Sequence, residues 1–418
     1  MATAALRQPR ASACRFCGTP LAHSFIDLGM QPPSNSYLRP ADLKRREAFF
    51  PLHAYVCASC LLVQLESFRS PAEIFSDYAY FSSYSASWLR HAEAYCATMI
   101  KRFGFGPKCR VVEVASNDGY LLQYFAGYGI PVLGVEPAAN VAQAARARAV
   151  PTHVGFFGEA TARKLVADGY AADLLVGNNV LAHVPDLNDF VAGLRVALKP
   201  DGILTMEFPH LLRLIEGNQF DTIYHEHFSY YSFMTAERIF AAHGIVLFDV
   251  EELSTHGGSL RIYGCRAESG RPPLDRVAAL KEREKAAGLH TLAAYDGFGR
   301  RAEAVREALL AFLREAKKDG KSVAAYGAAA KGNTLLNYCG IGADAIAYVA
   351  DDSPHKQGRC LPGSHIPIVA PSRIAETRPD YLLILPWNLT SEIIGANAHI
   401  RSWGGRFVIP IPTLAVIE

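Results

Sequence analysis

Short apolar runs alternate with helical stretches through the middle of the chain, which is the pattern of a parallel sheet covered by helices. The first such run is 110–115, which leads through the turn 116–119 into a helix expected at 120–127. A second strand, expected at 132–135, ends on Glu136. We therefore predict a doubly wound α/β domain in the centre of the chain.

The alternation continues beyond this first unit. A helix is expected to begin near Ala86, ahead of the first strand. The later central elements are a strand ending at 154–157, a strand opening the stretch 173–184, a helix at 187–198, a strand at 202–209 and a hairpin of 245–250 with 260–263. The charged, alanine-rich stretch 275–317 has a helical period and predicts a pair of connecting helices. A second Rossmann-like unit follows, with strands expected at 322–326, 346–350 and 381–385.

The composition restricts the class of protein. With 418 residues the chain is too long for one ordinary core, which indicates two or three domains. Half of the residues are hydrophobic and the formal net charge is +2, so nothing favours nucleic acid or an acidic membrane as a partner. We see no apolar export segment at the N-terminus and no run long enough to span a membrane. We expect a cytoplasmic protein.

Four of the nine cysteines form two C-x-x-C pairs, Cys14 with Cys17 and Cys57 with Cys60. In a chain without an export signal, such pairs indicate a metal rather than disulfides. Four thiolates close a tetrahedral zinc shell and leave no position open for catalysis, so the predicted role is structural. We assign residues 1–70 to a zinc-binding module, with free thiols as the alternative.

The turn after the first central strand indicates a nucleoside cofactor. Residues 113–119 read E-x-A-x-N-x-G, which lacks the glycine cradle of a dinucleotide turn and fits S-adenosylmethionine (SAM) better. The acidic residue that ends the second strand is placed to bind the ribose hydroxyls. The predicted cofactor contacts are Glu113, Ala115, Asn117, Asp118, Gly119, Glu136, Phe157 and Asn178. From the turn alone, a Rossmann dinucleotide site remains the alternative.

The stretch 221–231, D-T-I-Y-H-E-H-F-S-Y-Y, concentrates aromatic and ionisable side chains. Because so many polar groups would need partners in a core, we predict that it lines a pocket containing a base and an orienting group. The alternative is a helix start with satisfied core histidines. The aromatic segment 75–85 either enters this pocket or straps the zinc module to the next domain. His183 either faces the pocket from a strand end or is structural, and the 254–259 turn either reaches the site or closes a hairpin.

A second small-residue turn opens the C-terminal unit, where 326–333 reads Y-G-A-A-A-K-G-N. Tiny side chains let backbone N–H groups approach a phosphate, and a lysine adds positive charge there. We predict that the turn binds a diphosphate through Tyr326, Gly327, Ala328, Lys331 and Asn333. A degenerate structural copy of the fold is the alternative.

The predicted fold class is therefore α/β with three parts. A small four-cysteine zinc module at 1–70 is followed at 71–300 by a lead-in helix and a Rossmann-type SAM methyltransferase domain. A second Rossmann-like α/β domain, which binds the substrate nucleotide, is expected at 301–418.

Four motifs occur in one order: the four cysteines, E-V-A-S-N-D-G at 113–119, Y-H-E-H at 224–227 and Y-G-A-A-A-K-G at 326–332. In this order the chain resembles, over nearly its whole length, the sugar C-methyltransferases of deoxysugar biosynthesis. The type it resembles acts at C-3 of a dTDP-linked 4-keto-6-deoxy sugar. The resemblance implies that His227 is the general base, supported by Tyr224, Glu226, His183 and Tyr78.

The resemblance further implies that the ketone acidifies the neighbouring C–H group, that the base removes its proton, and that the enolate takes the methyl group of SAM. The expected substrate is a nucleotide-diphosphate 4-keto-6-deoxy sugar. Four alternatives stay open: a zinc-ribbon methyltransferase acting on RNA or protein, O- or N-methylation of the same sugar, C-methylation at C-5 or of a non-sugar ketone, and a non-enzymatic nucleotide-binding module. The nucleotide base, the sugar configuration and the oligomeric state are left open, and a monomer is compatible with the sequence.

Overall fold

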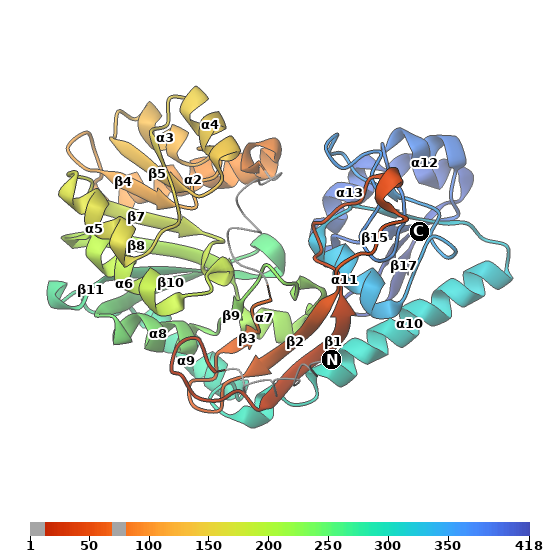
Figure 1. Cartoon of the computed structure of the whole chain (residues 1–418), viewed down its shortest axis with the longest axis horizontal. Coiled ribbons are helices and arrows are strands. Elements are labelled where there is room, and N and C mark those ends of the chain that lie inside the picture. The colour runs from red at the N-terminus through yellow and green to blue at the C-terminus, as the bar shows by residue number, and fades with distance from the viewer. Residues whose placement is uncertain (1–12, 69–80) are drawn as a thin grey trace, which may run out of the picture.

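The computed structural model describes residues 13–68 and 81–418, and these residues form three β-sheets joined by helices (Figure 1). The predicted α/β fold class is confirmed. Across the described ranges, no helix combines the length and the apolar character that crossing a membrane requires. The domain boundaries expected at residues 70 and 300 stay predictions.

The largest sheet has seven strands in the order β10-β11-β8-β7-β4-β5-β6. Strands β4 to β8 are parallel, and the β10–β11 hairpin adds to β8 in the antiparallel direction. The strand order reverses between β4 and β7, and ligands of such sheets bind outside the carboxyl ends at that point. The strands are β4 (Val111–Val114), β5 (Val132–Glu136), β6 (Thr152–Val154), β7 (Ala172–Asn178), β8 (Leu198–Pro209), β10 (Ile245–Leu253) and β11 (Ser259–Arg266).

Helices cover both faces of this sheet because successive apolar strand residues point to opposite sides. Val111 packs in one cluster with Tyr95 of α2, and the next residue, Val112, packs in another with Leu194 of α6. The helix expected near Ala86 is α2, which the Ser85 side chain caps by accepting the Trp88 N–H at 3.2 Å. The helices are α2 (Ala86–Phe103), α3 (Leu122–Gly127), α4 (Ala139–Ala147), α5 (Glu159–Ala167), α6 (Leu187–Ala197), α7 (Leu211–Glu216), α8 (Phe233–Ala242) and α9 (Asp275–Ala286).

The C-terminal sheet has six strands in the order β14-β13-β12-β15-β16-β17, of which the last is antiparallel. Its strand order reverses between β12 and β15, so this second sheet also has a switch point, as predicted for a Rossmann-like unit. The strands are β12 (Val323–Tyr326), β13 (Val349–Ala350), β14 (Ile368–Val369), β15 (Tyr381–Ile384), β16 (Arg406–Ile409) and β17 (Ala415–Ile417). The helices are α10 (Phe298–Lys318), α11 (Ala330–Cys339), α12 (Ser372–Thr377) and α13 (Thr390–Ala396).

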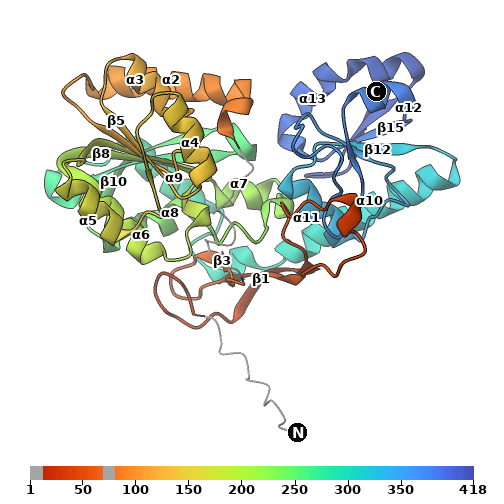
Figure 2. The same cartoon turned by 45° about the horizontal axis from the view of Figure 1, so that its top comes forward.

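The third sheet was not anticipated, because it combines the N-terminal module with a strand from the middle of the chain. Its order is β1-β2-β3-β9, all antiparallel. The strands are β1 (His23–Gln31), β2 (Phe50–Val56), β3 (Val63–Leu65) and β9 (Ser229–Tyr230). Figure 2 shows β1 and β3 below the two larger domains. The stretch 221–231 therefore contributes strand β9 to the N-terminal sheet.

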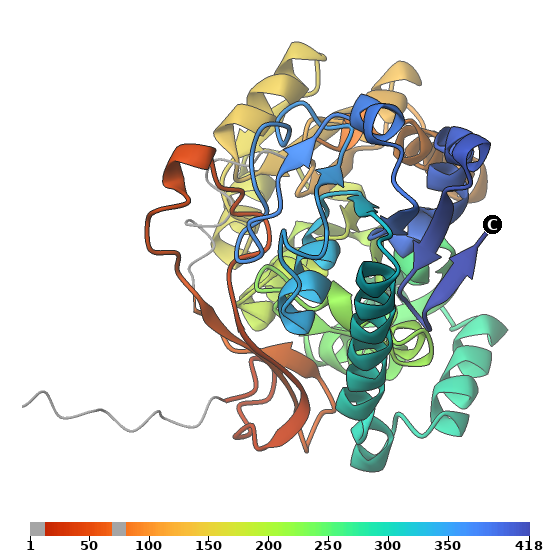
Figure 3. The same cartoon turned by 90° about the vertical axis from the view of Figure 1, so that its right-hand side faces the viewer.

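The N-terminal module shares cores with both neighbours. The apolar residues of β1 and β2 belong to the same cluster as those of α10, α11 and β12, and Phe25 of β1 stacks on Phe298 of α10 at 4.6 Å between ring centroids. Figure 3 shows α10 as the long helix in front of the other elements. On the opposite side, Cys14, Cys57 and Cys60 pack with the apolar residues of the central sheet. The module thus holds the two larger domains together by hydrophobic burial.

Candidate active site

The loop 221–228, which we call the base loop, begins within the short turn Phe220–Thr222 and leads into β9. His227 points its Nδ1 at the Thr222 carbonyl oxygen, 3.0 Å away, and its Nε2 at the Tyr224 hydroxyl, 2.7 Å away. A carbonyl oxygen only accepts, so Nδ1 carries the proton and donates it to Thr222. Nε2 of the neutral ring is therefore the acceptor, which is the state that a general base requires.

A second imidazole lies beside the first. His183 follows β7, and its Nδ1 donates to the Glu226 carbonyl oxygen at 2.8 Å. The rings of His183 and His227 meet edge to face with 4.8 Å between centroids. Burial lowers the pKa of His183 to about 4. Burial, followed by the neighbouring His183, lowers the pKa of His227 well below its ordinary value. Both rings are therefore neutral at pH 7.

Glu226 is buried, and its carboxylate accepts a hydrogen bond from Asn35 Nδ2 at 2.7 Å. His227 Nδ1 bonds to the Thr222 carbonyl oxygen. This backbone group therefore orients the ring in the position that sequence reasoning had given to Glu226. Tyr78, which was predicted to assist, lies outside the described residues. Asn35 belongs to the N-terminal module, so this module contacts the base loop through the Glu226 side chain.

The C-terminal domain holds the base loop at several points. Trp387 Nε1 donates to Asp221 Oδ2 at 2.8 Å, and Thr334 Oγ1 donates to the Ile223 carbonyl oxygen at 3.2 Å. Phe220, just before the loop, meets Tyr338 of α11 edge to face. None of these contacts was predicted, although the position of Trp387 just after β15, at a carboxyl strand end, was a usable signal.

The N-terminal module holds the other half of the loop. His225 Nε2 lies 3.2 Å from the Pro51 carbonyl oxygen of β2, and Leu65 N–H donates to the Phe228 carbonyl oxygen at 3.0 Å. Arg15, inside the first C-x-x-C pair, stacks over the Phe228 ring at 5.4 Å. Residues of the N-terminal module, the central domain and the C-terminal domain therefore fix one eight-residue loop, so its geometry depends on the whole chain.

The 254–259 turn closes the β10–β11 hairpin, and its histidine lies beside the residue that follows β7. His256 Nε2 lies 3.4 Å from Asn179 Nδ2, and the His256 ring meets Trp88 of α2 at 5.4 Å between centroids. Burial, followed by the charge on Lys331, lowers the pKa of His256 to about 4. Trp88 is an additional candidate that the sequence analysis did not single out, whereas His256 lies in the turn whose role it left open.

The turn after β4, which was predicted to contact the cofactor, bends sharply at the carboxyl edge of the sheet. Three of its residues have positive φ, Ala115 at 55°, Asn117 at 49° and Gly119 at 77°, which bends the backbone sharply at the switch point. Glu136, at the end of β5, accepts the N–H groups of Asn117 at 3.0 Å and Ala138 at 2.9 Å. The acidic group predicted to bind the ribose is thus held at the carboxyl edge beside the turn.

Several buried polar atoms around this turn have no hydrogen-bond partner at normal distance in the described part of the chain. They are both carboxylate oxygens of Glu113, Ser116 Oγ, Asp118 Oδ1 and both amide atoms of Asn178. Burial raises the pKa of Glu113 well above its ordinary value, with Glu136 and Asp118 adding to the rise and Tyr120 opposing it. Buried polar groups are normally paired. This set therefore fits a polar, cationic ligand, and SAM carries both an ammonium and a sulfonium group.

Phe157 was predicted to lie beside the adenine. It is partly buried and packs edge to face against Phe190 of α6, with 5.6 Å between ring centroids. The preceding residue, Phe156, is 45% exposed. Its position after β6 makes Phe156 a second candidate for the adenine contact, which the sequence analysis overlooked because the two rings are adjacent.

The turn after β12 differs from the cofactor turn because its polar groups have partners. Ala328 N–H donates to Asp351 at 2.7 Å, and Tyr326 donates to Asp352 at 2.6 Å. Lys331 Nζ donates to Asn388 at 2.6 Å and lies 4.7 Å from the centroid of the Trp387 ring. Gly327 has φ 90° and lies so close to Pro386 that a Cβ there would be 2.4 Å from its Cδ.

Two features of this second turn still suit an anion. Lys331 donates to an amide rather than to a carboxylate, and burial lowers its pKa against the opposing effect of Asp221. The buried Asn333 Nδ2 has no partner within residues 13–68 and 81–418. In contrast, the Ala328 N–H that was expected to meet a phosphate already meets a carboxylate. The predicted diphosphate contact is therefore best supported at Lys331 and Asn333, on the first turn of α11.

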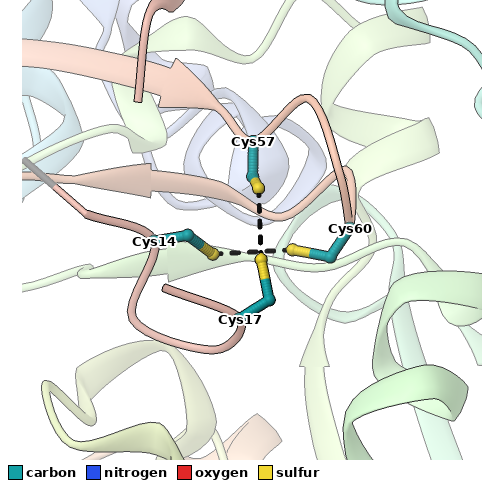
Figure 4. Close-up of side chains that lie close together, drawn as sticks. All are labelled: Cys14, Cys17, Cys57 and Cys60. Carbon is teal, nitrogen blue, oxygen red and sulfur yellow. Dashed lines mark hydrogen bonds between the residues drawn. The ribbon is translucent and has the colours of Figure 1, made fainter. Parts of the chain in front are cut away.

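The four cysteine sulfurs converge in the N-terminal module (Figure 4). All four lie within 4.8 Å of one another, and the pairs Cys14–Cys60 and Cys17–Cys57 are 3.5 Å apart. Zinc–sulfur bonds of about 2.3 Å place tetrahedral sulfurs roughly 3.8 Å apart, so the cluster fits a Zn²⁺ ion. Gln64 Nε2 donates to Cys14 Sγ at 3.1 Å, the kind of outer contact that orients a thiolate ligand.

Family models match three successive parts of the chain. A proposed zinc binding domain covers residues 14–75, a methyltransferase domain covers 88–250, and a C-methyltransferase C-terminal domain covers 254–412. The four-cysteine cluster falls in the first of these and the base loop in the second.

One relative is similar over almost the whole chain. The C-methyltransferase NovU of Streptomyces niveus is 36% identical over 405 residues, which is 97% of this chain and 96% of that protein. A structure of the PH0226 protein from Pyrococcus horikoshii OT3 is 18% identical, with a TM-score of 0.37, over 48% of this chain and 100% of that one. A magnesium protoporphyrin IX methyltransferase from Synechocystis PCC 6803 is 14% identical, with a TM-score of 0.33, over 43% and 79%. These two structural similarities are too low to support a functional argument.

Proposed function

The chain belongs to the C-methyltransferases, and on this premise we propose that it methylates C-3 of a nucleotide-linked 4-keto-6-deoxy sugar. Its cofactors are SAM, the methyl donor, and a structural zinc ion. The single observation that carries the proposal is the neutral His227 ring, whose Nδ1 is fixed on Thr222 and whose Nε2 is left as an acceptor. C-methylation needs such a base, because the carbon must lose a proton before it becomes nucleophilic.

The proton step follows from this geometry. The C-4 carbonyl acidifies the C-3 hydrogen, His227 Nε2 takes that proton, and the electron pair of the C–H bond moves into the enolate. SAM supplies an electrophilic methyl group, so that a carbon–carbon bond forms at C-3, the sulfonium carbon–sulfur bond breaks and S-adenosylhomocysteine leaves. A base positioned in this way accelerates proton transfer by about 10² to 10⁴.

Tyr224 has a defined part in the proposed step. Its hydroxyl donates to His227 Nε2 at 2.7 Å, so it holds the acceptor position before the substrate arrives. We propose that a substrate oxygen takes this hydroxyl as the sugar binds, which frees Nε2 for the C-3 proton. We propose that the neutral His183, whose Nδ1 is fixed on the Glu226 carbonyl, also contacts the sugar.

The two switch points support the division of ligands between the two large domains. Glu113 and Asn178 supply unpaired buried groups for the charged amino-acid part of SAM, and Glu136 supplies a carboxylate for the ribose. Lys331 and Asn333 supply a cation and an amide N–H at the C-terminal switch point for the diphosphate of the sugar nucleotide. The base loop lies between elements of both domains and receives hydrogen bonds from the C-terminal one.

The test is to incubate the protein with SAM and a panel of nucleotide-linked 4-keto-6-deoxy sugars, varied in base, configuration and C-3 substituent. We expect one panel member to gain a methyl group whose carbon NMR shift and couplings place it on C-3. A methyl group on oxygen or nitrogen would contradict C-methylation of this substrate class. A methyl group on C-5 would retain the chemistry and contradict the position.

A further inference from the structure

Trp387 belongs to the C-terminal domain and contacts two segments of the central domain, the base loop and the 254–259 turn. It follows β15 at the switch point, where the Lys331 ammonium lies 4.7 Å from its ring centroid. Its indole N–H donates to Asp221 at 2.8 Å. On its far edge the ring abuts Gly257, where an added Cβ would be 2.4 Å from Cη2 of the indole. The indole therefore touches a substrate-binding candidate, the base loop and the hairpin that carries His256.

The contact with Asp221 connects Trp387 to the proposed base. Asp221 is completely buried, and the indole is the only side chain that donates to its carboxylate within the part of the chain that the structure describes. Asp221 and Thr222 occupy consecutive positions in the Phe220–Thr222 turn. The Asp221 side chain faces Trp387, while the Thr222 carbonyl receives the Nδ1 proton of His227. A rotation of this short turn would move the carbonyl on which the His227 tautomer depends.

We infer that Trp387 is a positioning residue, which holds Asp221 and thereby fixes the Thr222 carbonyl that orients His227. The inference rests on the proposed function for the role of His227, but not for the contacts themselves. It assigns a task to the C-terminal domain beyond holding the nucleotide, because the residue stacked with Lys331 also sets the orientation of the base. Burial raises the pKa of Asp221 to about 6, so a lost indole hydrogen bond would leave a carboxylate that protonates easily.

The test uses Trp387→Phe, which keeps an aromatic ring and removes the N–H group. Trp403→Phe is the matched control, since Trp403 of the same domain donates its indole N–H to the Pro379 carbonyl oxygen at 3.0 Å and does not contact the base loop. Asp221→Asn is the second variant, because it keeps an oxygen that accepts the indole hydrogen bond. Circular dichroism and thermal unfolding of all three variants establish that they are folded.

The first readout is the tautomer of His227 in the substrate-free protein, followed by NMR with ¹⁵N-labelled histidine and assigned by comparison with His227→Asn. We expect one Nδ1-protonated form in the wild type and in Trp403→Phe. In Trp387→Phe we expect a mixture of tautomers, with Asp221→Asn in between. The second readout is kcat, which we expect to fall by up to about 10²-fold in Trp387→Phe, as misplacement of a reacting group does, with the KM for SAM unchanged.

Equal His227 spectra and equal kcat values in Trp387→Phe and Trp403→Phe would overturn the inference. If Trp387→Phe does not fold, Asp221→Leu replaces it, because leucine cannot accept the indole hydrogen bond. A wild-type tautomer and a wild-type kcat in Asp221→Leu would overturn the inference as well. Failure of the proposed function is distinguishable, because it would appear as a wild-type protein that methylates no keto sugar. The NMR readout needs no substrate and tests the positioning role in either case.

Discussion

The central and C-terminal sheets share a topology with a switch point, yet the turns at their switch points differ in how their polar groups are satisfied. Around the turn after β4, Glu113, Asp118 and Asn178 carry buried atoms without partners in the described residues. At the corresponding turn after β12, Ala328 N–H meets Asp351, and Tyr326 meets Asp352. Polar groups at the first turn lack hydrogen-bond partners that a ligand would supply, whereas those at the second turn are largely paired within the protein.

A shared fold therefore does not imply a shared use of its binding edge. Unpaired buried groups cost stability, and a protein retains them where a ligand repays that cost. The self-satisfied turn instead makes a rigid platform for the side chains beside it. From this platform Trp387 and Thr334 reach the base loop, while Lys331 and Asn333 are the residues that we propose for the substrate.

The largest effect is expected where the two sheets meet, at the base loop. His227→Asn should lower kcat by about 10² to 10⁴, because it removes the proton acceptor, while the dissociation constant of SAM stays unchanged. Steady-state kinetics and calorimetry measure the two quantities. His225→Asn is the matched control, since His225 faces Pro51 and Phe50 rather than Tyr224, and we expect it to retain most of the turnover.

A similar loss of turnover in both histidine variants would show that the motif is needed only for folding. Near-normal turnover in His227→Asn would contradict the assignment of His227 as the base. The proposed division of ligands between the two large domains would not be affected.

The next effect concerns the incomplete turn. Glu113→Gln should weaken SAM binding by about 10-fold to 100-fold, because the neutral amide loses a charge-assisted interaction with a cationic ligand. Binding of the sugar nucleotide should not change. Isothermal titration with each ligand separately measures both, and a variant that loses the sugar nucleotide instead would reverse the assignment of the two switch points.

The reciprocal change is Lys331→Met. It should raise the KM for the sugar nucleotide by about 10-fold, because the diphosphate loses a cation, and it should leave the affinity for SAM unchanged. Lys321→Met is the control, since Lys321 lies exposed at the opposite end of β12 and pairs with Asp380. Equal KM values in the two lysine variants would indicate that the second turn binds no anion.

The smallest expected effect is on stability without ligands, and its sign should differ between the two turns. Asp351→Ala should lower the free energy of unfolding by about 1–3 kcal/mol, because Ala328 N–H and its neighbours lose their acceptor. Glu113→Gln should raise it by about 1 kcal/mol at pH 7, because an unpaired carboxylate leaves the core. Denaturant titrations monitored by fluorescence give both values.

The pH dependence follows from the raised pKa of Glu113. A carboxyl group whose pKa is higher in the folded chain favours folding while it is protonated, so its contribution is full below the unfolded value of about 4.3 and is lost as the pH rises. The stability gain of Glu113→Gln should therefore shrink between pH 7 and pH 4.5. A gain that grows toward acid pH would mean that Glu113 has an unrecognised cationic partner.

Local pattern was sufficient for the elements and for the residues at their ends. The apolar runs predicted β4, β5 and β12, and Glu136 and Lys331 could be placed because each directly follows a predicted strand or turn. The two C-x-x-C pairs predicted the sulfur cluster from spacing alone. For the elements, and within each C-x-x-C pair, the relevant information lies within about ten residues of chain, where periodicity and turn chemistry act.

The contacts that organise the base loop could not be predicted in this way. Asn35 lies 191 positions from Glu226, and Trp387 lies 166 positions from Asp221. The pairing of β3 with β9 likewise joins segments whose own patterns say nothing about each other. The role of the Thr222 carbonyl could not be predicted for another reason. Every residue has a backbone carbonyl, so the residue type does not indicate which one accepts a hydrogen bond. Such contacts follow from how whole domains pack.

The most direct test of the central claim is hydrogen exchange at C-3 in heavy water, without SAM, followed by proton NMR of a nucleotide-linked 4-keto-6-deoxy sugar that the protein methylates. We predict that the wild type replaces the C-3 hydrogen with deuterium and that His227→Asn does not. Exchange by His227→Asn at the wild-type rate would contradict the claim that this imidazole removes the proton.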